Sequence, residues 1–189
     1  MKSFLNGKKI LILFFFCLCS CASNTVIENA SFVWLTNSSK YFLLPTQYIE
    51  KPMDSHQFIS AFFDGRNFQT NVWVKADETG VDMVFINEMG STMGNLSFCG
   101  KTIFFSSSVF PKTLRPEYII ADFQLCFYNA SAVRQEIESS GLVFEETLTG
   151  RRILDGSGVI VIIEIIKTHN TVSLINHLRG YTYTLEGYF

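Results

Sequence analysis

Residues 57–76 read QFISAFFDGRNFQTNVWVKA, and this stretch indicates the class of fold. From residue 68 to residue 75, the side chains Phe, Thr, Val and Val alternate with Gln, Asn, Trp and Lys. A period of two is typical of a strand that has one covered face. Residues 64–67, DGRN, carry a turn signal between this strand and a second apolar segment at 57–63. The stretch therefore predicts an antiparallel hairpin.

Strand signals continue along the chain on both sides of a helical segment. Pro116 suits the first turn of a helix, and apolar residues follow it at helical spacing from Ile119 to Phe127. Asn129 is placed to cap a second helix, which Gly141 would end. Further strands are expected over 81–87, 95–106, 142–148, 152–154, 158–167, 171–176 and 181–188.

The apolar run 159–166, interrupted only by Glu164, favours a central strand with helices on one face and a concavity on the other. Residues 38–55 contain two prolines and are expected to form a loop. Together the patterns predict one mainly β (α+β) domain. It would be a curved antiparallel sheet that forms an unclosed or closed barrel, with a helical pair packed across it.

The composition excludes several classes of protein. Hydrophobic residues make up 48% of the 189 residues and charged residues only 17%, which excludes a disordered chain. The net charge of −2 argues against a nucleic-acid partner, because phosphate contacts need clustered Lys and Arg.

The N-terminus carries a targeting signal. A lysine-containing start precedes the apolar run 10–18, which is too short to span a bilayer, since spanning needs about 20 residues. Residues 18–21, LCSC, resemble a bacterial lipobox, whose last cysteine is acylated and becomes the mature N-terminus. The alternative is an ordinary secretory signal cut near Ala22 or Ser23.

These features predict a lipoprotein signal peptide over 1–20, a tether over 21–30 and a single domain over 31–189. Acyl chains on Cys21, palmitate among them, would anchor the chain to a membrane without spanning it. Ala22 stands where lipoproteins retained in the inner membrane often have Asp. By that rule the destination is the periplasmic face of the outer membrane.

No catalytic or metal-binding constellation emerges from the sequence. The three histidines lack metal-ligand spacing, and no cofactor is implied. The segment 90–94, GSTMG, resembles a nucleophile elbow, but it joins two expected strands and is better interpreted as a hairpin loop. We therefore expect no enzyme. Cys99 and Cys126 would be either two buried small apolar residues or a disulfide pair in the oxidising periplasm.

Aromatic residues, at 15% of the chain, are the remaining signal. They serve either a large core or, collectively, a cavity for an acyl chain. Met89 and Met93, on either side of Gly90, suggest a loop that inserts into a membrane or contacts a partner. The candidates for a cavity or its lid are Phe62, Trp73, Phe85, Phe98, Ile119, Phe123, Tyr181 and Tyr183.

The second half of the chain resembles a known family. Residues 116–125 read PEYIIADFQL, followed by RIL at 152–154, Asn176 and GYTYTL at 180–185. This order is similar to that of the bacterial domain-of-unknown-function 3261 lipoproteins, and LP at 44–45 with AFFDG at 61–65 agrees. The matching motif residues are Asp122, Gln124, Arg152, Asn176 and Gly180.

The resemblance implies an outer-membrane lipoprotein similar to the LolA/LolB type of carrier, an unclosed barrel with a helical lid over an apolar cavity. It implies acyl-chain lipids or lipoproteins as cargo, a periplasmic LolA-like carrier as partner and a link to aryl-polyene-type lipid export. The alternative is a non-catalytic structural or interaction lipoprotein with no cavity and an exposed apolar patch. A hydrolase would need a nucleophile–base pair, which the sequence does not offer.

Overall fold

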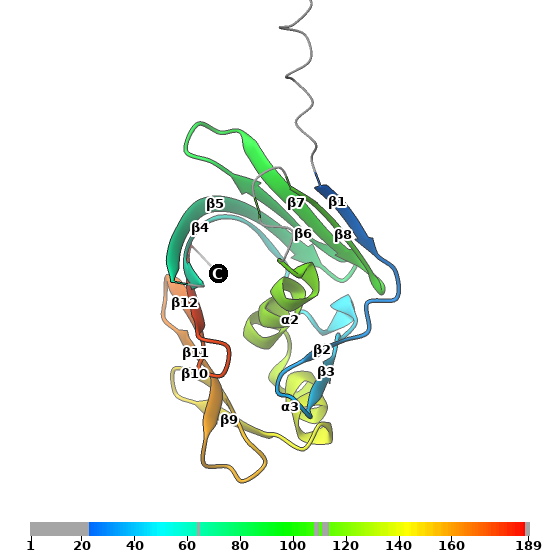
Figure 1. Ribbon diagram of the computed structural model, residues 1–189, viewed down its shortest axis with the longest axis vertical. Coiled ribbons are helices and arrows are strands. Elements are labelled where there is room, and N and C mark those ends of the chain that lie inside the picture. The colour runs from blue at the N-terminus through cyan, green and yellow to red at the C-terminus, as the bar shows by residue number, and fades with distance from the viewer. Residues whose placement is uncertain (1–22, 64, 108–109, 111–113, 188–189) are drawn as a thin grey trace, which may run out of the picture.

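The computed structural model describes residues 23–63, 65–107, 110 and 114–187. Within them, an 11-stranded antiparallel sheet has the order β1-β8-β7-β6-β5-β4-β13-β12-β11-β10-β9 (Figure 1). β1 and β9 are its two edges, so the sheet is not closed. The strands are β1 (Ser23–Ile27), β4 (Met53–Phe63), β5 (Arg66–Asp77), β6 (Gly80–Ile86), β7 (Thr92–Cys99), β8 (Thr102–Ser107), β9 (Val143–Thr147), β10 (Gly150–Leu154), β11 (Val161–Lys167), β12 (Thr171–Asn176) and β13 (Tyr181–Glu186).

The hairpin and the helical pair predicted from the sequence are confirmed. β4 and β5 pair continuously, from Met53 with Ala76 to Phe63 with Arg66. The helices are α2 (Pro116–Phe127) and α3 (Ala130–Ser139). The Asn129 side chain accepts a hydrogen bond from the Ser131 amide and so caps α3.

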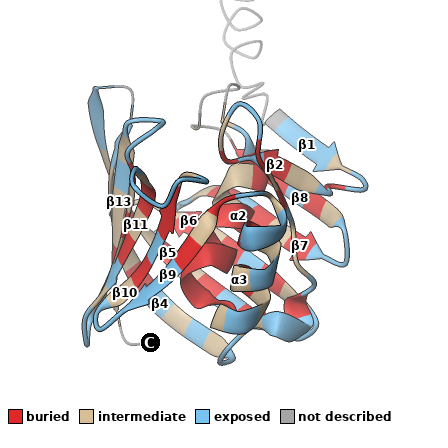
Figure 2. Ribbon diagram, turned by 90° about the horizontal axis from the view of Figure 1, so that it is seen from below, coloured by how far each residue is buried: buried red, intermediate tan, exposed pale blue. Residues whose placement is uncertain are grey.

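The sheet curls around α2, which lies inside the curve, while α3 packs beside β9 (Figure 1). Nearly every residue of α2 is buried, because the sheet covers it from several directions. The inner face of β5 to β8 is the main part of the core, and it appears red in Figure 2. Among the most deeply buried residues of that part are Val72, Val81, Leu96, Phe98 and Ile103.

Two expectations about the first half of the chain are wrong. The tether expected over 21–30 is a strand from Ser23 to Ile27, where β1 pairs with β8. Thr25, Val26 and Ile27 are β-branched, and such residues favour strands. The loop expected over 38–55 contains the strand β3 (Lys40–Phe42), which pairs with β2 (Phe32–Trp34), the short helix η1 (Thr46–Tyr48) and the start of β4.

The run 159–166 is not a central strand. β11 begins only at Val161 and is third from the β9 edge of the sheet. Val159 and Ile160 belong to the preceding turn and are exposed. The reason is local, because the Asp155 carboxylate accepts hydrogen bonds from both of their amides and holds them in the turn.

The strand registers define two ends of the sheet. Ser23 pairs with Ser107, and the turns β4–β5, β6–β7, β10–β11 and β12–β13 lie at the same end, which we call the Ser23 end. The turns β5–β6, β7–β8, β9–β10 and β11–β12 lie at the opposite end, together with Gly187. We call this the Gly187 end. α2 runs from the first end toward the second.

Candidate functional site

The inner face of the sheet is less completely buried on β4 and β13 than on β5 to β8. Most side chains that point toward α2 from these two strands are half-buried, whereas Gln57 and Leu185 are buried and Phe63 is exposed. The rings of Phe63 and Tyr181 lie edge to face with centroids 6.5 Å apart. Phe68 of β5 and Ile119 of α2 are also only partly buried. We call these partly exposed apolar residues the inner strip: Ile59, Ala61, Phe63, Phe68, Ile119, Tyr181 and Tyr183.

A buried polar cluster joins α2 to the sheet beside the inner strip. The Tyr181 hydroxyl donates to the Asp122 carboxylate, with oxygen–oxygen distances of 2.8 and 3.0 Å. The Asn176 amide nitrogen donates to the same hydroxyl at 3.2 Å. The side-chain carbonyl oxygen of Asn176 accepts a hydrogen bond from the backbone amide of Arg179 at 2.9 Å, which fixes the turn containing Gly180. At Gly180 the backbone has a positive φ of 67°, which glycine adopts without strain.

Burial decides the electrostatics of this cluster. It raises the pKa of the Asp122 carboxyl to about 7, against the opposing influence of the Tyr181 hydrogen bond and the Arg179 charge. The pKa of Tyr181 is also raised, by burial first and by the neighbouring carboxylate second. Asp122 therefore changes its charge near neutral pH inside the protein.

Arg179 closes the cluster on its solvent side. Its guanidinium donates to the carbonyl of Trp34 at 2.6 Å and to the hydroxyl of Tyr118 at 3.0 Å. It also lies over the Tyr118 ring, 4.6 Å from the centroid. The β12–β13 turn, α2 and β2 are thereby held together at the Ser23 end.

Gln124 is fully buried and attaches α2 to the chain before η1. Its side-chain amide donates to the carbonyl of Leu44 and accepts from the amide of Leu44, each at 2.9 Å. This two-way bond satisfies a stretch of backbone that belongs to no strand. The role of Gln124 is therefore structural in this fold.

At the Gly187 end, the buried arginine is Arg151 and not the motif residue Arg152. The Arg151 guanidinium donates to the carbonyl of Leu125 at 2.8 Å and lies 3.4 Å from the Glu50 carboxylate. Arg152 points to the outer face, where it pairs with Glu164 at 2.8 Å. The alternation with the buried Ile153 could have identified Arg151 from the sequence, because residues two apart on a strand share a face.

Lys167 stands beside Arg151 in a shallow, mostly polar pocket of about 230 Å³. Burial, followed by the positive charge of Arg151, lowers the pKa of the Lys167 amine. Its ammonium also lies 5.9 Å from the centroid of the Phe127 ring.

The expected cavity residues are divided between the two faces of the sheet. Phe85 and Phe98 are buried on the inner face, and Phe123 of α2 packs on Phe127 with ring centroids 4.9 Å apart. Phe62 and Trp73 lie on the outer face, contrary to expectation, because the buried Val72 and Val74 set the inner face of β5 and the alternating positions point outward. The Trp73 indole donates there to Asp54 at 2.8 Å.

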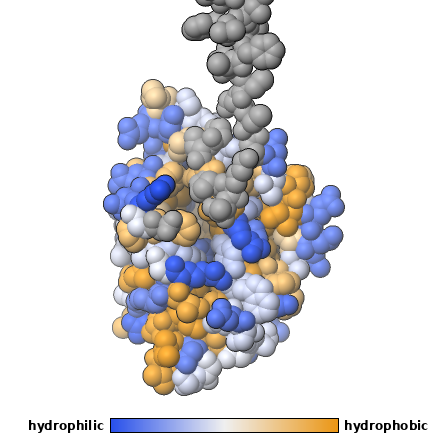
Figure 3. Space-filling view, viewed as in Figure 1, coloured by the Kyte–Doolittle hydropathy of each residue, from blue (hydrophilic) through white to orange (hydrophobic). Residues whose placement is uncertain are grey.

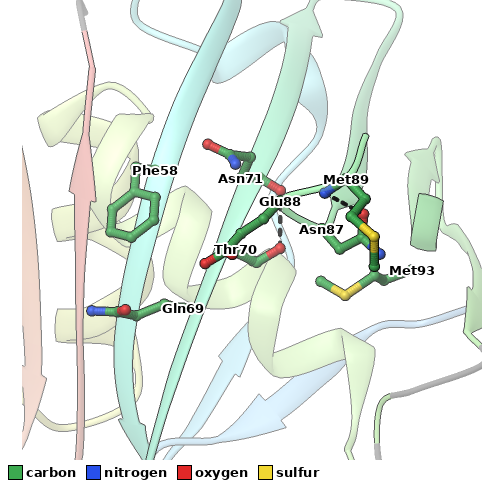
Figure 4. Close-up of a pocket in the computed structure, with 8 residues that line it drawn as sticks. All are labelled: Phe58, Gln69, Thr70, Asn71, Asn87, Glu88, Met89 and Met93. Carbon is green, nitrogen blue, oxygen red and sulfur yellow. Dashed lines mark hydrogen bonds between the residues drawn. The ribbon is translucent and has the colours of Figure 1, made fainter. Parts of the chain in front are cut away.

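The segment 90–94 lies in the β6–β7 hairpin, as expected, and not in a strand-to-helix turn. Here the Asn87 side chain accepts hydrogen bonds from the amides of Met89 and Ser91. Figure 4 shows Met89 and Met93 beside a pocket of about 280 Å³. Neither this pocket nor the one at Lys167 is an enclosed apolar cavity, since both are open and lined by polar residues among others.

The two cysteines of the domain are free thiols, so the disulfide alternative does not hold in this structure. Cys99 is exposed, contrary to the expectation of a buried residue, because it ends β7 on the outer face. Cys126 is buried on α2 with its sulfur 3.8 Å from the Tyr183 hydroxyl. Burial raises the pKa of the Cys126 thiol to about 12.

Cys21 lies outside the described residues, as does the expected signal peptide. Among the residues that the structure does describe, no helix is long and apolar enough to cross a bilayer. The same residues contain no group of three His, Cys, Asp or Glu side chains that could hold a metal ion.

These features define a mainly β protein in which an open antiparallel sheet wraps one buried helix. The family model described as "Protein of unknown function (DUF3261)" matches residues 54–187, and the chain belongs to this family. The match covers the sheet from β4 onward and both helices. No curated protein matches the chain.

Proposed function

We propose that the protein is a lipid-anchored envelope protein that binds the acyl chain of a lipid or lipoprotein along the inner strip. The proposal includes acylation of Cys21 and a place on the periplasmic face of the outer membrane. It also includes a LolA/LolB-like carrier fold, in which the open sheet surrounds the inner helix, and a function linked to aryl-polyene-type lipid export.

The observation that carries this proposal is the incomplete burial of the inner strip. Elsewhere on the inner face, apolar side chains are almost completely removed from water, as Val72 and Phe98 are. Apolar residues that remain half-exposed on a concave face gain free energy when a ligand covers them, at about 25 cal/mol for each Å². An acyl chain matches such a strip because it offers apolar surface and needs no hydrogen bonds.

The motif residues support a positional role beside that strip. Asp122, Asn176 and Gly180 hold α2 and the β12–β13 turn in place through Tyr181, which is itself part of the strip. A ligand that contacts Tyr181 would therefore act directly on the bond between helix and sheet.

The test uses the chain from residue 22 onward, secreted to the periplasm behind a foreign signal peptide. Native mass spectrometry and organic extraction should find an acyl-chain molecule bound in near-stoichiometric amount. A protein that stays free of ligand, including after incubation with lipids and acylated peptides, would contradict the proposal and favour an interaction lipoprotein without a cavity.

A matched pair of variants localises the binding. Ala61→Trp places a large side chain in the inner strip and should weaken acyl-chain binding by about tenfold or more. Ser60→Trp introduces the same side chain one residue away on the outer face and should leave binding unchanged. Equal effects of the two variants would place the ligand elsewhere.

A further inference from the structure

Exposed apolar side chains are concentrated at the Ser23 end of the sheet. Besides Met89 in the β6–β7 turn, five of them come from the ends and turns of adjacent strands, in the order β4, β13, β12 and β11, and are between 43% and 77% exposed. In Figure 3, apolar side chains gather in the lower part of the view, over the β9 to β11 side of the sheet. We call this set the apolar rim: Phe62, Phe63, Val159, Ile160 and Leu178.

The rim is held in a fixed conformation. The Asp155 carboxylate accepts hydrogen bonds from the amides of Val159 and Ile160, at 3.0 and 2.9 Å. Leu178 lies in the turn that Asn176 closes by its bond to the Arg179 amide. Ordered turns that direct large apolar side chains into water are unusual, because such exposure gains nothing for the folded chain alone.

The opposite end of the sheet provides the contrast. The turns at the Gly187 end consist of residues 78–79, 100–101, 148–149 and 168–170. Of these described residues only Leu148 is large and apolar, and the others are charged, polar or glycine. The apolar exposure of the turns is therefore a property of one end of the molecule.

The position of the proposed anchor also supports a role for the Ser23 end. Cys21 is two residues before Ser23, and two residues span at most about 7 Å of chain. An acylated Cys21 therefore brings the Ser23 end, with its rim, to the surface of the bilayer. The Gly187 end would point away from it.

We propose that the apolar rim is a membrane-docking surface that inserts into the lipid bilayer beside the Cys21 anchor. The proposal rests on the anchor named under the proposed function and does not depend on a ligand in the inner strip. Charged side chains of both signs, Arg66 and Glu88, are exposed near the same end. Docking is therefore governed by apolar burial and should depend little on salt or anionic lipid.

The first experiment replaces the natural anchor, so that its outcome is independent of acylation. The chain from residue 22 is tethered by an N-terminal hexahistidine tag to phosphatidylethanolamine–phosphatidylglycerol vesicles that contain a nickel-chelating lipid. An environment-sensitive fluorophore is attached either to Cys99, near the Gly187 end, or to Leu178→Cys in a Cys99→Ser background. Cys126 is buried and stays unlabelled.

The label at position 178 should gain fluorescence several-fold and become inaccessible to aqueous iodide, whereas the label at Cys99 should behave as in water. Equal exposure of both labels to iodide would overturn the proposal. Protection of position 178 by an added envelope protein, and not by lipid, would also overturn it and make the rim a protein-binding site.

A matched pair of variants provides the second readout. The double variant Val159→Asp/Ile160→Asp should abolish the fluorescence gain at position 178, because charged side chains resist transfer into the bilayer. Leu148→Asp changes an even more exposed apolar side chain at the other end and should leave the gain intact. Unfolding midpoints close to that of the parent protein would show that the variants are folded. Insertion by the double variant as strong as that of the parent would contradict the rim as the docking surface.

Discussion

The helix α2 is attached to the sheet at two points, by its own Asp122 carboxyl group and, about one turn further on, by the guanidinium group of Arg151 from the sheet. At the Ser23 end, Asp122 is bonded to Tyr181, and its charge is lost when it binds a proton near neutral pH. At the Gly187 end, the Arg151 guanidinium donates to the carbonyl of Leu125, an acceptor that carries no titratable proton. The Asp122 attachment should therefore depend on pH near neutrality, while the Arg151 attachment should not.

The largest loss of stability is expected when the attachment by Arg151 is removed. Arg151→Met leaves the Leu125 carbonyl without its side-chain donor and should lower the free energy of unfolding by about 2–4 kcal/mol. Arg152→Met removes only the ion pair on the outer face and should cost less than about 1 kcal/mol. Urea unfolding of both variants measures the difference. Similar losses would mean that burial of Arg151 contributes little to stability.

The carboxyl attachment predicts a dependence of stability on pH. The folded protein holds the Asp122 proton up to about pH 7, whereas the ordinary pKa is 3.8. Between these values only the folded state binds the proton, so the contribution of Asp122 to stability should be fully present below about pH 4 and fall by about 2–4 kcal/mol as the pH rises to 7. Asp122→Asn should remove this slope in urea unfolding from pH 4.5 to 8. An unchanged slope would assign it to other groups.

The hydroxyl that faces Asp122 should have a smaller effect. Tyr181→Phe removes its donor and should cost about 1–2 kcal/mol at pH 8, where the carboxylate is charged, and less at pH 5. Tyr183→Phe is the control, since its hydroxyl has only the Cys126 sulfur, at 3.8 Å, as a partner among the described residues. Thermal unfolding at the two pH values separates the variants. A loss for Tyr181→Phe that is independent of pH would contradict the coupling to Asp122.

The smallest expected effect is a difference in reactivity between the thiols of Cys99 and Cys126. Cys99 should react with a maleimide in the folded protein within minutes, because it is exposed. Cys126 should react only when the protein unfolds, because burial raises its thiol pKa to about 12. Mass spectrometry after timed labelling counts the modified thiols. Rapid labelling of Cys126 would show that α2 leaves the sheet easily.

The sequence was sufficient for the elements whose pattern is local. The alternation in 68–75 gave the β4–β5 hairpin, and Pro116 and Asn129 marked the two helix starts. The division between the two faces of β4 was harder, because Phe62 and Phe63 are both aromatic and only the partner strands decide which one points inward.

Elements that depend on long-range contacts could not be predicted from local sequence patterns. β1 depends on pairing with β8, about 80 residues later, and its short β-branched run was not sufficient to predict that pairing. The exposure of Val159 and Ile160 depends on the side chain of Asp155, although their apolarity suggested a buried strand. Asp122, Asn176 and Gly180 were recognised as a motif, but only the structure shows that Tyr181 joins the first two.

The position of β1 has a mechanical consequence. A pull on the chain before Ser23, as from the proposed anchor at Cys21, loads β1 along its own axis, in the direction from Ile27 to Ser23. Hydrogen bonds of an antiparallel pair stand perpendicular to the strands, so this force acts on the β1–β8 bonds in shear and must break them together. A pull on Ile27 in the direction away from β8 would instead open the pair one residue at a time. If Cys21 carries the proposed anchor, the edge strand is placed where it resists detachment from the membrane most strongly.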